Sequence, residues 1–186
     1  MDEKVVIFPK VFTIYTFNVK NYIQETKNWI DSFVIQYNLC PFAKKPFVQD
    51  TIRYVIYEGE DWEELGLILQ KELGNLEKTP KNTTETTIII IPAALSDFND
   101  YLDYLAFANR LIFALRLDGV LQIASFHPDY QFAETEYSDV TNFTNRSPFP
   151  LLHLLREESV EQALAHYDEP ESIPEKNMET MRRLFE

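Results

Sequence analysis

The amino-acid sequence predicts an α/β or α+β fold, a single-domain sandwich in which helices pack on a sheet of four or five strands. Three observations lead to this prediction. Segments with helical periodicity alternate with short β-branched segments in the order α-β-α-β-α-β-loop-β-α. The chain has 186 residues, a length typical of one domain. Hydrophobic residues make up 45% of it, which is enough to form a core.

The sequence divides into three regions. Residues 11–17 are β-branched and aromatic, so we interpret residues 1–20 as an N-terminal arm or edge strand. Residues 21–167 are expected to form a single globular domain. Residues 168–186 are expected to be an acidic linker with a short C-terminal helix over Asn177–Phe185.

Apolar residues at helical spacing predict the first helix over Asn21–Leu39. Asn21 and Gln24 form the expected N-terminal cap, and the helix ends ahead of Pro41 because the residue before a proline is displaced from helical geometry.

The middle of the chain alternates strands and helices. A helix is expected from a cap at Asp61 to about Leu76, and another from a cap at Ser96 to Gly119. Three segments have the β-branched content of strands: Thr51–Tyr57, Thr86–Ile91 and Val120–Phe126.

A loop of about two dozen residues, His127–Pro150, follows the third of these strands. A loop of this length in a compact domain is usually functional or disordered, and its aromatic and proline residues argue against disorder. Leu151–Leu155 then predicts a strand, and Ser159 with Gln162 predicts the cap of a helix that runs to His166.

Composition excludes several classes of function. The formal net charge of −13 disfavours nucleic-acid binding, because the surplus carboxylates repel phosphates. Only four glycines occur and no glycine-rich phosphate loop is present, so no cofactor is expected. No apolar run has the length of a membrane helix, and the single cysteine agrees with a reducing compartment. We therefore expect a soluble cytoplasmic protein.

Three segments, Asn38–Ala43 (NLCPFA), Gly119–Phe132 (GVLQIASFHPDYQF) and Asp139–Glu161 (DVTNFTNRSPFPLLHLLREESVE), resemble an uncharacterised family, the domain of unknown function numbered 1415. The resemblance covers roughly residues 29–166. Because this family has no established activity, the resemblance implies membership and no particular reaction.

Cys40 has three alternative interpretations. If Pro41 opens a short helical turn, helix-end N–H groups favour a thiolate at Cys40 and a nucleophilic role. If Cys40 instead closes the first helix, the negative end of that helix disfavours the thiolate. The third interpretation, a small buried apolar residue, is the commonest for a free cysteine.

His127 and Asp129 are the other predicted catalytic residues, and Tyr130 is a predicted substrate contact. They follow a central strand, and the ends of strands are where sites gather in α/β sheets. His127 is expected to transfer a proton, its tautomer fixed by Asp129 or a backbone carbonyl. The alternative is a turn in which His127 only bonds the backbone.

Asn145, Arg146 and Ser147 are predicted to bind an anionic group, with Arg146 supplying a bidentate guanidinium. A self-bonded loop is the alternative, since Asn, Thr and Ser readily form side-chain turns. Arg156 or Arg53 is expected to assist Arg146.

His153 lies on the same strand face as Leu151 and is either a substrate contact or a satisfied core residue. His127, Asp129, His153 and Cys40 would form a sensible set of metal ligands. Because they include no tight pair such as His-x-x-x-His or Cys-x-x-Cys, no metal is predicted.

The sequence thus leads to two hypotheses. The first is a small-molecule enzyme that acts on an anionic metabolite through a pocket containing Cys40, His127 and Arg146. The second is a non-catalytic domain that binds an anionic metabolite or a protein partner with the same loop.

Overall fold

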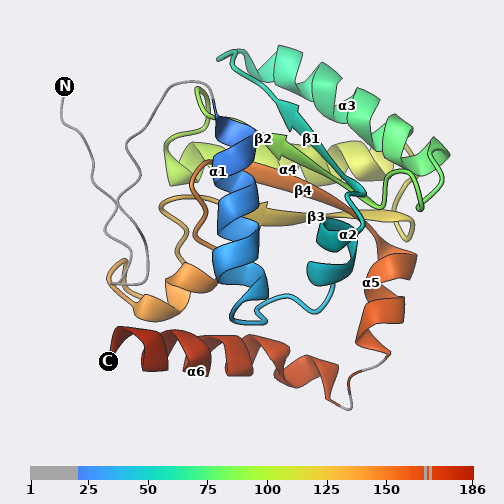
Figure 1. Ribbon diagram of the computed structural model, residues 1–186. Coiled ribbons are helices and arrows are strands. Elements are labelled where there is room, and N and C mark those ends of the chain that lie inside the picture. The colour runs from blue at the N-terminus through green and yellow to red at the C-terminus, as the bar shows by residue number, and fades with distance from the viewer. Residues whose placement is uncertain (1–20, 166, 168) are drawn as a thin grey trace.

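The computed structural model describes residues 21–165, 167 and 169–186 (Figure 1). The arm or edge strand predicted for residues 1–20 lies outside the described residues, as do positions 166 and 168 near the predicted linker.

One sheet of four strands organises the described chain. The strands are β1 (Ile52–Ile56), β2 (Thr86–Ile90), β3 (Leu121–Phe126) and β4 (Leu151–Arg156), in the spatial order β1-β2-β4-β3. β1 is parallel to β2, whereas β4 is antiparallel to both of its neighbours. The predicted α/β sandwich is confirmed, and the sheet is mixed because β4 inserts between β2 and β3.

Helices cover both faces of the sheet (Figure 1). α3 (Trp62–Lys78) and α4 (Phe98–Ala114) pack on one face, where their leucines and tyrosines meet the inner residues of β2 and β4. α1 (Tyr22–Trp29), a π-helix over Ile30–Ile35 and the short α2 (Lys44–Val48) cover the other face.

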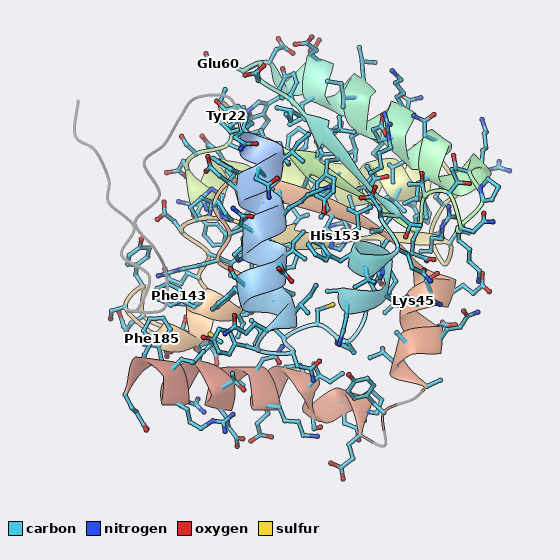
Figure 2. All side chains as sticks on the ribbon, viewed as in Figure 1. Tyr22, Lys45, Glu60, Phe143, His153 and Phe185 are labelled. Carbon is cyan, nitrogen blue, oxygen red and sulfur yellow. The ribbon has the colours of Figure 1, made fainter. Side chains whose placement is uncertain are left out.

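The two C-terminal helices follow β4. α5 (Glu157–Leu164) comes directly after the strand, and a 3₁₀ turn over Pro170–Ser172 leads to α6 (Ile173–Phe185). Figure 2 shows the ring of Phe185 against that of Phe143, with 4.5 Å between the ring centroids. Met181 of α6 is fully buried, so this helix belongs to the same apolar cluster as α1.

β2 and β4 are the two inner strands of the sheet, and apolar clusters cover both of its faces. Every residue of β2 is buried. In β4, Leu152 and Leu154 face α3 and α4, whereas Leu151 and His153 face α1 and α2. His153 is therefore a polar side chain on an inner strand.

The capping of two helices differs from the predictions. The side chain of Asn21 makes no capping bond at α1. α4 is capped by Asp97 and not by Ser96, because the Asp97 carboxylate accepts the N–H groups of Asn99 and Asp100 at 2.8 and 3.2 Å. A carboxylate is the stronger acceptor for these free amides.

Two further helices, α5 and α6, begin earlier in the sequence than predicted. α5 begins at Glu157, with acidic residues in its first turn, and Ser159 lies inside it without capping it. α6 begins at Ile173, four residues before Asn177, because a proline in the first turn supplies the helical φ.

Among the described residues, no helix combines the length and the apolar character needed to cross a lipid bilayer.

Tyr101 connects α4 to two strands. Its hydroxyl donates to the carbonyl of Leu151 in β4 at 2.7 Å and accepts the amide of Phe126 in β3 at 3.1 Å. We predict that Tyr101→Phe lowers the free energy of unfolding by about 1–3 kcal/mol, because a buried carbonyl and a partly buried amide lose their partner. Urea denaturation measures this.

Tyr104→Phe is the matched control, since the Tyr104 hydroxyl is buried in the same helix without a hydrogen-bond partner among the described residues. It is expected to cost nothing or to stabilise slightly. Equal losses in both variants would show that the Tyr101 bridge contributes nothing.

Candidate functional site

A small cavity lies between the α1 side of the molecule and the sheet. Its free volume is about 40 Å³. Trp29 at the end of α1 and Cys40 in the following turn line one side, and Thr86, Phe126 and His153 line the sheet side. Figure 2 shows His153 on the sheet beside α1 and above α2. We call this space the α1–α2 pocket.

The backbone beside the pocket is a π-helix. Its wider turns are seen in the bond from the Leu39 amide to the Val34 carbonyl at 2.9 Å, five residues back. Such segments are rare and occur frequently at functional sites. The chain then turns at residues 41–43 before α2, and Cys40 lines the pocket just ahead of this turn.

Thr86 fixes the protonation of His153. The Thr86 hydroxyl oxygen lies 2.5 Å from the carbonyl oxygen of Leu154 and 2.8 Å from Nε2 of His153. Because a hydroxyl has one proton and a carbonyl can only accept, Thr86 donates to Leu154. Nε2 of His153 must then be the donor to Thr86, which leaves Nδ1 as the unprotonated nitrogen.

Burial keeps His153 neutral. The ring lies in the pocket lining, and no acidic group in the described part of the chain offsets its desolvation, which lowers its pKa from 6.5 to about 4. At neutral pH, His153 is therefore an uncharged imidazole whose Nδ1 is a hydrogen-bond acceptor.

Cys40 lies in the same pocket. Burial raises the pKa of its thiol, while the amides of Phe42 and Ala43 act in the opposite direction. These amides are the helix-end N–H groups expected from the first interpretation of this residue, but desolvation is the larger effect. The thiol is thus protonated at neutral pH, and Cys40 packs among the apolar residues of the cluster.

His127 lies on the other face of the sheet. Its ring packs against Phe98 and Tyr101 of α4, with centroids 5.2 and 5.1 Å apart. Nε2 lies 2.9 Å from the Leu95 carbonyl, and Nδ1 accepts the Asp129 amide at 3.0 Å. Burial lowers the pKa of His127. Both ring nitrogens are engaged, which leaves neither free to transfer a proton.

Asp129 and Tyr130 take part in the turn after β3. The amide of Asp129, not its carboxylate, holds His127; the carboxylate accepts the Tyr137 hydroxyl at 2.7 Å. Tyr130 packs on Phe98, with 5.2 Å between centroids.

Arg146 makes its contacts within its own loop, residues 127–150. Its Nε donates to the Tyr130 carbonyl at 3.1 Å, and one terminal nitrogen donates to the Tyr137 carbonyl at 2.7 Å. The guanidinium lies over the rings of Tyr137 and Phe143. Only 6% of Arg146 is exposed. These contacts are those of a self-bonded loop.

The neighbours of Arg146 also bond to the backbone. The side-chain amide of Asn145 donates to the Ser125 carbonyl at 3.1 Å, and the Ser147 hydroxyl donates to the Phe149 carbonyl at 2.6 Å. The carbonyl of Asn145 accepts the His127 amide, so the loop is joined directly to the end of β3.

Arg53 and Arg156 lie at the opposite end of the strands from Arg146. Arg156 pairs with Leu121, the first residue of β3, whereas the loop of Arg146 adjoins the last. Arg53 forms a two-bond ion pair with Glu72 of α3, at 2.7 and 3.1 Å. The structure therefore does not bring Arg53 or Arg156 together with Arg146, because they lie near opposite ends of the strands.

A terminal nitrogen of Arg156 is hydrogen-bonded to the backbone. It donates to three backbone carbonyls at the end of α3 and in the turn that follows, those of Leu76, Thr79 and Thr84. Arg156 therefore closes the carbonyl end of a helix.

Comparison with known families gives one match. The profile described as "Protein of unknown function (DUF1415)" matches residues 21–186. The chain belongs to this family. The match confirms the resemblance seen in the sequence and extends it over α6. Comparisons with curated proteins and with solved structures found no match.

In this DUF1415 protein, the predicted site residues separate into three groups. Cys40 and His153 share the α1–α2 pocket. The turn and loop residues, His127, Asp129, Tyr130, Asn145, Arg146 and Ser147, gather at the end of β3. Arg53 and Arg156 lie near α3. Among the described residues, no group of three or more His, Cys, Asp or Glu side chains is placed to hold a metal ion.

Sequence reasoning missed two residues of the pocket, Trp29 and Thr86. Thr86 and Thr87 begin a strand that is otherwise isoleucine, so a hydroxyl at its start was a usable signal. Trp29 is one of only two tryptophans, but nothing in its sequence position indicates a cavity.

The neutral His153 makes stability depend on pH. Its pKa is about 4 when folded and 6.5 as the unperturbed value, so the unfolded chain takes up the proton first as pH falls. We predict that stability is lost as pH falls from about 6.5 to about 4, by about 2–3 kcal/mol for this residue. His127, whose pKa is also lowered, adds to the loss.

Urea denaturation of the wild type and of His153→Gln at pH 7 and pH 4.5 measures this dependence. The variant is expected to lose less stability between the two pH values. An unchanged difference would exclude a buried neutral His153.

Proposed function

We propose that this protein binds a small molecule in the α1–α2 pocket. The observation that carries the proposal is the convergence of three polar side chains, Cys40, Thr86 and His153, in a cavity with otherwise mostly apolar walls. Ligand sites in proteins usually combine apolar walls with a few placed polar groups of this kind.

Of the two functions expected from the sequence, binding has the stronger support. Burial raises the pKa of Cys40, so the free protein holds a thiol and not a nucleophilic thiolate. His127 has both ring nitrogens bonded. An anionic ligand remains a prediction, because within the described residues the hydrogen bonds of Arg146, Arg53 and Arg156 are made to other protein groups.

An enzyme that acts through Cys40 is the second candidate. It is favoured by the amides of Phe42 and Ala43 at the sulfur and by the unprotonated Nδ1 of His153 in the same pocket. A ligand that brings a polar group to the thiol would reduce the desolvation that now raises its pKa.

A thermal-shift screen of neutral, anionic and cationic metabolites tests the binding proposal. A ligand at 100 times its dissociation constant stabilises by about 2.7 kcal/mol. Hits are expected to disappear in Ala43→Phe, since Ala43 lines the pocket and a ring there fills it.

Gly74→Ala is the control, because it lies in α3 on the other face and an added Cβ there meets nothing within 4 Å. It is expected to keep every hit. Hits that survive Ala43→Phe would mean that the ligand binds elsewhere.

The alkylation rate of Cys40 separates binding from catalysis. Because the thiol is protonated, we predict that iodoacetamide labels it slowly below about pH 8.5, the ordinary thiol value, and equally slowly in His153→Gln. The single cysteine makes the readout unambiguous. Rapid labelling near pH 7 that is lost in His153→Gln would instead establish a thiolate paired with His153, and the second candidate would replace the first.

A further inference from the structure

One residue of the pocket lining, Trp29, carries a hydrogen-bond donor without a partner among the described residues. Trp29 is 6% exposed, and its indole N–H is buried with no acceptor among the described residues. A buried N–H without a partner is destabilising, so an acceptor is expected at this position when the site is filled.

The pocket also contains an acceptor without a partner. Nε2 of His153 donates to Thr86, and no hydrogen bond within the described part of the chain reaches Nδ1. The rings of Trp29 and His153 both pack against Phe126, with centroid distances of 5.3 and 6.4 Å. The unpaired donor and the unpaired acceptor therefore border the same small space.

Nothing charged lines this space. The described lining has no Asp, Glu, Lys or Arg, and the thiol of Cys40 and the ring of His153 are both neutral at pH 7. Burial of an ion without a partner of opposite charge is strongly unfavourable. The lining therefore selects against carboxylates, phosphates and ammonium groups.

A hydroxyl group meets both requirements, because it accepts one hydrogen bond and donates another. A carboxylate can only accept and would leave Nδ1 unpaired, and an ammonium group can only donate and would leave the indole unpaired. The free volume of about 40 Å³ limits the enclosed part of the ligand to a few heavy atoms.

We propose that the ligand of the α1–α2 pocket is an uncharged, largely apolar alcohol whose hydroxyl group accepts from the Trp29 indole and donates to Nδ1 of His153. This inference rests on the proposed binding function and specifies the ligand class for that same site.

Three probes of equal length test the ligand class: 1-butanol, butyrate and butylammonium. The readout is the indole N–H signal of Trp29 in ¹H–¹⁵N NMR spectra, which contain only two such signals because the chain has two tryptophans. Trp29→Phe assigns the signal. We expect 1-butanol alone to shift it, with saturation. Equal affinity for either charged probe would contradict the proposal of an alcohol ligand, and the pocket would still be a binding site.

Two variants test the contact itself. His153→Phe keeps a ring but removes the acceptor, and it is expected to weaken 1-butanol binding about tenfold. The control is Trp62→Phe in α3, which is expected to leave the affinity unchanged, since Trp62 packs on Tyr104 in the other layer. An unchanged affinity in His153→Phe would overturn the proposal.

The ¹⁵N shifts of His153 give a test that needs no ligand. We expect a protonated Nε2 and an unprotonated Nδ1 at pH 7. The opposite tautomer would contradict the hydrogen bond proposed between the alcohol and Nδ1, but it would not contradict the binding function. If the tautomer is as expected but 1-butanol does not shift the Trp29 signal, the alcohol proposal fails, and the metabolite screen with Ala43→Phe decides the binding function separately.

Discussion

The hydrogen bond between Thr86 and His153 is the constraint on which the pocket depends. β4 is an inner strand with helices on both of its faces, so a histidine within it must be satisfied inside the protein. Thr86 on the adjacent β2 does this with one hydroxyl, which donates to the Leu154 carbonyl and accepts from Nε2. The bond orients the ring and assigns its tautomer, and so directs the free nitrogen to the remaining polar groups of the cavity.

The two faces of the sheet have different roles in this account. On the α4 side, Leu95, Asp129 and Tyr101 hold His127 and the loop after β3, and the buried Arg146 joins the parts of that loop. These polar groups satisfy one another, which is how a long loop remains ordered. On the α1 side, the indole of Trp29 and Nδ1 of His153 have no such partners among the described residues. Unsatisfied groups in a cavity are the feature expected of a binding site.

The sequence predicts the elements well and the site poorly, for physical reasons. Hydrophobic periodicity is a local property, so the helices and strands from residue 21 onward are largely recovered, with errors at caps such as Asp97. The histidine contacts are not local: the partner of His153 is 67 residues away in Thr86, and that of His127 is 32 residues away in Leu95. Which strand lies beside β4 decides these contacts, and periodicity carries no information about strand order. In the proposed function His153 is the ligand contact that was one of its two expected roles, whereas His127 has the alternative role of a turn residue that bonds the backbone.

A double-mutant cycle on Thr86 and His153 tests the central claim most directly. The free energies of unfolding of the wild type, Thr86→Val, His153→Phe and the double variant are measured at pH 7. We expect a coupling of about 1 kcal/mol, since each single substitution breaks the same partly buried hydrogen bond. Additivity within about 0.3 kcal/mol would mean that the bond does not fix His153, and the chemistry assigned to the pocket would then lose its basis.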